Sequence, residues 1–266
     1  MRNIPELSFR SIPTFHQLWD ACMERHLAAP AAFLKDVEGV FRRYGIRRSS
    51  SILDTCCGSG AFDIALMKRG FNLATTDGDA EMLKLFRKNL TENSLNHRPI
   101  LAKWRDLPSV FPRRKFDMLI CGGNSFIYAG GHWNGDGMID RKLALENMLE
   151  TLKVFRGLLV PGGILLVDKP TDDERRRETR IARVRIAEGS SYTVYFSVKR
   201  DTAKRCRNAQ ILLRHEWTGK EIGVPNVAYI LKDVELAELL FWAGFSSFEI
   251  LPRVPGQHFQ TWIVKA

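Results

Sequence analysis

The sequence predicts an α/β fold: a doubly wound, seven-stranded sheet with an antiparallel β insertion after the fifth strand. Short, wholly apolar runs such as Ile164 to Val167 recur along the chain, and segments with helical periodicity separate them. Strands buried on both faces of a parallel sheet give such runs, and alternation of strands with helices gives a doubly wound sheet. A change to two-residue alternation after Lys169 predicts the insertion.

The elements of this sheet can be placed in order along the chain. A helical segment over residues 14–45, which Gly45 ends, comes first. The predicted strands are 51–54, 71–76, 99–103, 116–121, 164–167, 248–251 and 261–264, and the predicted helices are 61–69, 79–90, 140–156 and 233–243. A glycine-rich loop spans 122–138, Pro161-Gly162-Gly163 reads as a turn, and the alternating segments 190–198, 209–217 and 226–231 make the insertion.

The stretch 51–79 points to a nucleotide-like ligand. Gly58 and Gly60 lack a Cβ atom, so the backbone can turn sharply and a ligand can lie against it. The helix that follows presents free N–H groups, and Asp77 can accept hydrogen bonds from both hydroxyls of a ribose. Asp63 stands where a dinucleotide fingerprint has a small residue, and it would repel a pyrophosphate. A cofactor without phosphates and with a cationic centre, such as S-adenosylmethionine, therefore fits better.

Ligands of doubly wound sheets bind at the carboxyl ends of the strands. In this chain that rule places one group of residues around a single crevice: Cys57–Gly60, Asp77, Trp104 and Gly122–Asn124.

Composition limits the class of protein. The chain has 266 residues, 45% of them hydrophobic, so it can bury a full core. No run approaches the roughly 18–20 apolar residues of a membrane helix, and the first residues lack a long apolar secretory segment. We expect a cytoplasmic protein without a membrane partner. The five cysteines form no C-x-x-C pair, so neither a metal site nor a disulfide framework is suggested.

The net charge of +10 suggests an anionic partner or substrate, and part of it is local. Six arginines fall within residues 175–185, which is compatible with RNA binding. Glu174, Glu178 and Glu188 interrupt this run, and no aromatic residue is interleaved before Tyr192. A solvated helix face with ion pairs explains the run at least as well, so nucleic acid is not the expected partner.

Five segments resemble, in order, the motifs of class I S-adenosylmethionine-dependent methyltransferases: LDTCCGSG, TTDGDAEML, KWRDL, FDMLICGGNSF and LVPGGILLVD. Within that superfamily the chain is most similar to the glycine and sarcosine N-methyltransferases. The residues that carry this likeness are Gly123-Asn124-Ser125-Phe126, Leu143–Asn147 and Pro255-Gly256-Gln257. The likeness covers roughly residues 50–170 well and 225–266 loosely.

The resemblance implies roles for particular residues. The residues it places at S-adenosylmethionine are Arg25, Asp54, Cys57, Gly58, Gly60, Asp77, Gly78, Met82, Lys103, Trp104, Cys121 and Gly122. Catalytic positions would be Asn124, Tyr128 and His132, and substrate-binding positions would be Asn124, Lys169, Tyr192 and His215. No metal is implied. The glycine-rich loop that holds Tyr128 and His132 could act as a lid.

One position departs from the glycine enzymes. There the strand that ends in Asp continues with His-Arg, and the arginine grips the substrate carboxylate. This chain continues from Asp168 with Lys169 and Pro170. A proline cannot offer that two-pronged contact, and a lysine replaces it only as a point charge. A different small amine or an anionic metabolite is therefore expected as the acceptor.

The sequence thus predicts methyl transfer to a small-molecule acceptor, with an amine nitrogen as the expected acceptor atom. The alternatives are an O-methyltransferase of a small metabolite, an RNA methyltransferase that uses segment 175–185, and a non-catalytic binding module. The predicted division is a helical cap over the cofactor site (1–48), an S-adenosylmethionine-binding core (49–170), a substrate-side β insertion (171–232) and the last core elements (233–266). A homo-oligomer is compatible with all of this.

Overall fold

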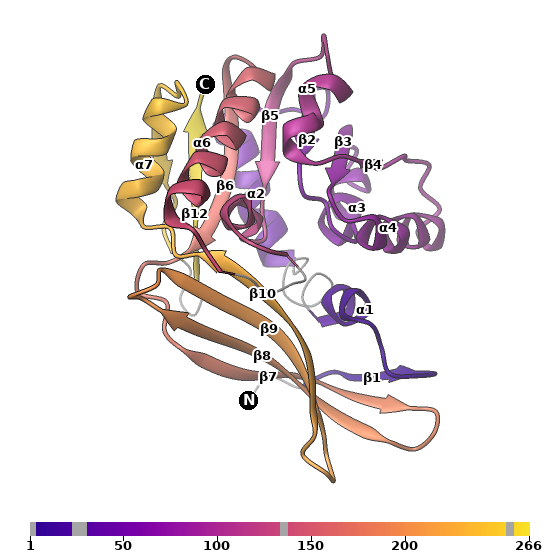
Figure 1. The fold of residues 1–266 in the computed structure, drawn as a ribbon. Coiled ribbons are helices and arrows are strands. Elements are labelled where there is room, and N and C mark those ends of the chain that lie inside the picture. Colours follow the sequence, from indigo (N-terminus) through magenta and orange to yellow (C-terminus); the bar gives the residue numbers. More distant parts are fainter. Residues whose placement is uncertain (1–3, 23–30, 134–137, 254–257) are drawn as a thin grey trace.

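The structure, a computed structural model, describes residues 4–22, 31–133, 138–253 and 258–266. Within these ranges the chain forms two separate sheets (Figure 1). We call them sheet A, which has five strands, and sheet B, which has seven.

Sheet B is the predicted doubly wound sheet. Its order is β11-β12-β6-β5-β2-β3-β4. The strands are β2 (Ile52–Asp54), β3 (Leu73–Asp77), β4 (Ile100–Leu101), β5 (Phe116–Cys121), β6 (Leu159–Pro170), β11 (Ser247–Ile250) and β12 (Phe259–Lys265). β12 runs antiparallel to both its neighbours, and the pairs from β6 to β4 are parallel. Seven strands in this arrangement confirm the predicted fold class.

Helices cover both faces of sheet B. They are α2 (Ala31–Arg43), α3 (Ala61–Met67), α4 (Ala80–Glu92), α5 (Leu107–Val110), α6 (Arg141–Leu158) and α7 (Asp233–Trp242). Neighbouring strand residues point to opposite faces, so Leu119 packs with α6 and α7 residues while Ile120 packs with α2 residues. Both faces being buried explains why the central strands are apolar throughout.

Sheet A contains the insertion and has the order β1-β7-β8-β9-β10. Its strands are β1 (Glu6–Phe9), β7 (Arg177–Ile186), β8 (Ser191–Asp201), β9 (Cys206–His215) and β10 (Glu221–Tyr229). The antiparallel pairing of β7 to β10 agrees with the alternating pattern. β1 adds a parallel edge strand that the sequence did not predict.

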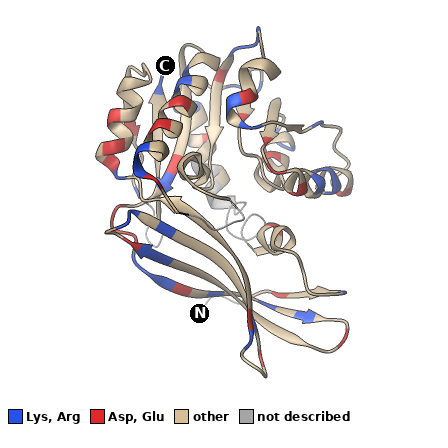
Figure 2. Cartoon of the chain, viewed as in Figure 1, with Lys and Arg blue, Asp and Glu red and all other residues tan. Residues whose placement is uncertain are grey.

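The helical interpretation of segment 175–185 is wrong, because most of it lies in β7. Ala182, Val184 and Ile186 are buried, whereas Arg185 is exposed. Burial of every second residue is the period of a strand. Arg183 pairs with Glu216 and Arg214 pairs with Glu178, and both basic and acidic residues occur along the strands of sheet A (Figure 2).

The helical segment predicted over residues 14–45 is described only in part, because residues 23–30 lie outside the described residues. Helix α1 (Phe15–Trp19) is short and begins at Thr14, which forms a capping box with Gln17. Helix α2 ends before Gly45, as predicted, and Gly45 has φ of +70°.

Strand β6 is longer than predicted and includes the expected turn Pro161-Gly162-Gly163. Its pairing with β5 is irregular between Phe116 and Met118, and Gly162 has φ of +75°. The turn is therefore a bulge at the start of the strand rather than a separate loop.

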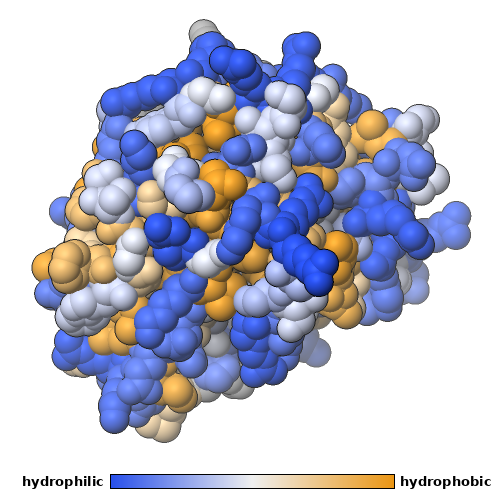
Figure 3. Space-filling view, turned by 90° about the horizontal axis from the view of Figure 1, so that it is seen from above, coloured by the Kyte–Doolittle hydropathy of each residue, from blue (hydrophilic) through white to orange (hydrophobic). Residues whose placement is uncertain are grey.

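Sheet A lies across the end of sheet B at which β5 and β6 finish (Figure 1). The opposite end of the molecule carries mostly hydrophilic side chains, with small apolar areas between them (Figure 3). In the part of the chain that the structure describes, no helix combines the length and apolar composition needed to cross a membrane.

Candidate active site

The glycine turn after β2 is held by the carboxylate at the end of β3. Gly58 and Gly60 have φ of +55° and +79°, which only glycine adopts without strain. The Gly58 N–H donates to Asp77 Oδ2 at 2.8 Å, and the Asp79 N–H donates to Asp77 Oδ1 at 2.8 Å. Each carboxylate oxygen can accept about two hydrogen bonds, so Asp77 keeps the capacity to bind ligand hydroxyls. The turn and the predicted ribose-binding acid therefore form one unit.

Gly60 allows a test of this unit. A Cβ atom there would lie 2.1 Å from two ring carbons of Phe86, and alanine would also be strained at this positive φ. We expect Gly60→Ala to lower the midpoint of thermal unfolding and to weaken cofactor binding. Gly157→Ala is the matched control, because a Cβ there meets nothing within 4 Å; a similar loss in both variants would contradict the expectation.

Three buried or half-buried acids gather at the ends of β2, β3 and β6. Burial raises the pKa of Asp54 to about 7, against the hydrogen bond from the Cys56 N–H, and the charges of Asp77 and Asp168 raise it further. Burial likewise raises the pKa of Asp168 to about 7 and of Asp77 to about 6. These carboxylates repel one another and would be stabilised by a cation placed between them.

Asp168 also lies at this site, and the sequence assigned it no role. Its carboxylate accepts the backbone N–H groups of Gly123, at 3.0 Å, and Asn124. Asp168 therefore shapes the loop after β5, where Asn124 adopts a left-handed conformation with φ of +60°. The available signal was its position: like Asp54 and Asp77, it is an acid directly after an apolar strand.

The side chain of Asn124 contains a buried polar atom without a partner in the described part of the chain. Its Oδ1 is buried and has no hydrogen-bond partner among the described residues. Buried polar atoms are almost always paired, because an unpaired one costs about 1–3 kcal/mol. This oxygen is therefore available to a ligand donor.

The other predicted cofactor residues lie around the same strand ends. Trp104 donates its Nε1–H to the Thr55 carbonyl at 2.8 Å, which leaves only its ring for a ligand. Cys57, Met82 and Cys121 are buried, Lys103 and Gly78 are exposed, and Gly122 is half-buried. Arg25 lies outside the described residues.

Tyr128 and His132 follow Asn124 in the 3-10 helix η3 (Ser125–Gly130) and just after it. The Tyr128 hydroxyl hydrogen-bonds the Arg207 side chain, and burial raises the pKa of the phenol. His132 pairs with Val227 of β10 through backbone hydrogen bonds of 2.6 and 3.0 Å, while its side chain is exposed. The contacts attach the loop to sheet A.

The structure does not support Lys169 as a substrate-binding cation. Its side chain is fully buried, and its ammonium lies 2.8 Å from Asp172 and 2.6 Å from Asp233. It also donates to the Pro170 carbonyl at 3.1 Å. Because side chains alternate along β6 and Asp168 faces the loop after β5, Lys169 points the other way.

Tyr192 and His215 are paired across β8 and β9 rather than gathered at the strand ends of sheet B. Their rings meet edge to face, with centroids 5.0 Å apart. His215 Nδ1 accepts the backbone N–H groups of Trp217 and Thr218, at 3.3 and 3.2 Å. These contacts hold both residues at a hairpin, and their predicted substrate contact stays a prediction.

Comparison with known proteins agrees with this geometry. The methyltransferase domain family matches residues 52–134. A glycine/sarcosine N-methyltransferase of Aphanothece halophytica is 28% identical over 61% of this chain and 54% of its own length. The glycine N-methyltransferase of Homo sapiens is 30% identical over 49% of this chain and 43% of its own length. The chain spans about half the length of these curated relatives.

A solved structure extends the likeness to the whole fold. The amino pentose methyltransferase of Micromonospora echinaspora, solved with S-adenosylmethionine bound, superimposes with a TM-score of 0.68. It covers 96% of this chain and 100% of its own, at 17% identity. The strand order and these matches show that the chain has the fold of the methyltransferase solved with S-adenosylmethionine, and that residues 52–134 are similar to the methyltransferase domain family.

Proposed function

We propose that this protein is an S-adenosylmethionine-dependent methyltransferase that methylates an amine nitrogen of a small molecule. The observation that carries the proposal is the turn of Gly58 and Gly60 held on Asp77, with Asp54 and Asp168 beside it. The relatives named above act on glycine, sarcosine or an amino sugar, which supports nitrogen as the acceptor atom.

The residues present fit this cofactor. Asp77 suits the two ribose hydroxyls, and the carboxylates of Asp54 and Asp168 suit a cationic group in a protein whose overall charge is +10. The same carboxylates disfavour a phosphate-bearing nucleotide. The free Asn124 Oδ1 offers an acceptor for an ammonium or amine donor.

The chemistry asks for positioning more than for acid–base groups. S-adenosylmethionine supplies a methyl group already activated on a sulfonium. The chain would bind and orient the acceptor and exclude water, which is the larger part of such catalysis. A neutral amine needs no protein base before transfer. This suits Tyr128, whose phenol stays protonated near neutral pH because burial raises its pKa.

Two observations bear on the acceptor. The buried ion pairs of Lys169 leave β6 without the cation that would grip a carboxylate, so glycine is disfavoured. Half of the arginine run is paired, since Arg177, Arg183 and Arg185 bind Glu174, Glu216 and Glu6. That pairing disfavours RNA. An O-methyltransferase remains the second candidate function. The cytoplasmic location and a homo-oligomer stay predictions.

The test is transfer of labelled methyl from S-adenosylmethionine to a panel of amines, amino sugars, hydroxylated metabolites and RNA, with glycine and sarcosine included. Transfer to a small amine supports the proposal. Transfer only to hydroxyl acceptors would correct the acceptor atom. Salt-sensitive transfer to RNA would overturn the acceptor class, and failure to bind S-adenosylmethionine would overturn the function.

Asn124 gives a sharper test of the acceptor position. We expect Asn124→Gly, which tolerates the left-handed φ of +60°, to lower turnover at least about tenfold with little change in cofactor affinity. Asn124→Ala removes the same amide but adds backbone strain, so any difference between the two variants measures that strain. Turnover equal to wild type in Asn124→Gly would remove this side chain from the acceptor site.

The raised carboxyl pKa values give a pH test. Because Asp54, Asp77 and Asp168 hold their protons to higher pH when folded, their contribution to stability is full below about pH 4 and is lost as pH rises through about 6 to 7. Ionisation over that range should favour a bound cation. We expect the affinity for S-adenosylmethionine, relative to the neutral thioether S-adenosylhomocysteine, to rise from pH 5.5 to 8. Calorimetry at each pH measures this ratio, and a constant ratio would contradict the site.

A further inference from the structure

One carboxylate beside the candidate site accepts hydrogen bonds from three separate parts of the chain. Asp79 begins α4, and its Oδ1 accepts the backbone N–H groups of Glu81 at 2.8 Å and Met82 at 3.2 Å. Its Oδ2 accepts from His16 Nε2 at 2.9 Å and from Trp133 Nε1 at 3.1 Å. Asp79 thus caps a helix and also binds two distant segments.

The two distant donors belong to segments that flank the cofactor residues. His16 lies in α1, near the start of the chain, and Trp133 lies just after η3, in the loop that begins with Asn124. Asp79 follows Asp77 by two residues and donates its own N–H to that acid. The shared carboxylate is therefore directly connected to the predicted ribose-binding residue.

Aromatic side chains join the same two segments. The Trp133 ring meets Trp19 edge to face, with centroids 4.6 Å apart, and meets Phe15 at 5.4 Å. It also meets the Tyr128 ring, with centroids 5.2 Å apart. Edge-to-face pairs add modestly to apolar burial, so α1 and the loop pack as one unit through Trp133.

Asp79 is held in its ionised form. Partial burial opposes ionisation, but the hydrogen bond from His16 and the charge of that ring outweigh it and lower the carboxyl pKa to about 2. The side chains of Asp79 and His16 are only 17% and 14% exposed. Hydrogen bonds to an ionised acceptor are stronger than those between neutral groups, and partial burial protects them from screening by salt.

We propose that Asp79 is a latch that positions α1 and the loop 122–133 together over the cofactor site, so that releasing either segment loosens both. The inference rests on the proposed function for the identity of the cofactor. Both segments must separate from Asp79 before the cofactor can exchange. The latch sets the rates of cofactor entry and release more than the affinity for the cofactor. The reason is that it holds α1 and the loop 122–133 in place both with and without the cofactor.

Three variants each cut one part of the latch. Trp133→Phe removes the N–H donor but keeps an aromatic ring. His16→Phe removes the other donor and also keeps a ring. Asp79→Asn removes the charge and remains a good helix cap. Trp217→Phe is the matched control, because that side chain is 91% exposed in a hairpin.

The first measurement is hydrogen exchange of the protein without cofactor. Trp133→Phe and His16→Phe should each speed amide exchange about tenfold in both α1 and the loop 122–133, and Asp79→Asn should do so at least as strongly. Trp217→Phe should change neither segment. If each variant affects only its own segment, the coupling through Asp79 is wrong.

The second measurement is stopped-flow exchange of S-adenosylhomocysteine. The latch variants should raise the dissociation rate about tenfold and the association rate in parallel, with the Kd changed less than threefold. Wild-type rates in Trp133→Phe with a normal Kd would overturn the latch and leave the proposed function intact. Failure of the wild-type protein to bind either S-adenosylmethionine or its product in calorimetry would overturn both proposals.

Discussion

Replacement of Asp77 by alanine is expected to weaken the binding of S-adenosylmethionine at least about a hundredfold, or about 2.7 kcal/mol. The carboxylate holds the Gly58 and Asp79 N–H groups at 2.8 Å each, and it is the group proposed to accept the ribose hydroxyls. Its loss leaves donors of both protein and ligand unpaired in a poorly solvated site, and an unpaired buried group costs about 1–3 kcal/mol. Isothermal titration calorimetry measures the change.

The comparison variant for this experiment is Asp106→Ala, since the Asp106 side chain is 53% exposed at the surface. It should bind the cofactor as wild type does. Thermal unfolding separates loss of the site from loss of the fold. Wild-type affinity in Asp77→Ala would show that the ligand does not use this carboxylate.

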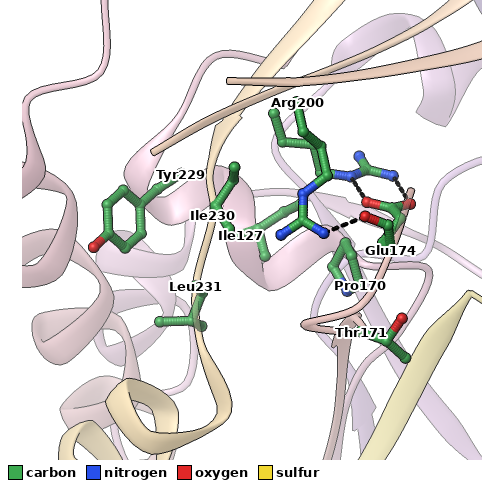
Figure 4. A pocket seen from close by; sticks show the side chains of 9 residues that line it. Ile127, Pro170, Thr171, Glu174, Arg200, Tyr229, Ile230 and Leu231 are labelled. Carbon is green, nitrogen blue, oxygen red and sulfur yellow. Dashed lines mark hydrogen bonds and ion pairs between the residues drawn. The ribbon is translucent and has the colours of Figure 1, made fainter. Parts of the chain in front are cut away.

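Replacement of Glu174 by glutamine is expected to cost about 3–5 kcal/mol of stability. Both Glu174 oxygens bind Arg207, at 2.7 and 3.0 Å, and Arg177 adds a contact at 3.2 Å. The Glu174 and Arg207 side chains are only 1% and 6% exposed. Figure 4 shows Glu174 beside Pro170 and Ile127, where sheet A meets the core. Removing the negative charge leaves a buried guanidinium uncompensated, so thermal unfolding should shift down by roughly 10 °C.

Sheet A contains a matched ion pair at its surface. Arg183 and Glu216 form the same two-pronged contact, but their side chains are 37% and 21% exposed. Glu216→Gln should therefore barely change the unfolding temperature, because water screens the pair. A double variant with Glu174→Leu and Arg207→Met should recover part of the loss, since it removes both charges of the buried pair and leaves only Arg177, whose side chain is 21% exposed, without its partner. Equal shifts in Glu174→Gln and Glu216→Gln would contradict the role of burial.

Local chemistry made part of this structure predictable. The glycine turn and Asp77 follow from backbone freedom and from strand order, and both occur as predicted in a sheet of the predicted class. The seven strands were found because burial on both faces imposes apolar runs that few other structures share. These features depend on neighbours in sequence or on a rule of topology.

Features set by tertiary contacts were missed. Strand β7 shows the alternation of a strand at Ala182, Val184 and Ile186, but the charges between these residues suggested a helix face. The direction of Lys169 depends on which face of β6 it occupies, and the sequence alone gives the charge without the direction. The two donors to Asp79 lie 63 and 54 residues away, so only the folded chain brings them together.

The position of β1 has a consequence for solubility. This short strand lies at the edge of sheet A, and its residues Glu6 to Phe9 pair with Arg183 to Ile186 of β7. An uncovered strand edge offers unpaired backbone groups to any other extended chain, which is a common route to aggregation. A shortened protein without these first residues would expose that edge along β7. With β1 in place, the edge of sheet A is a strand of 4 residues in place of the 10 residues of β7, so these residues shorten the edge that is open to self-association.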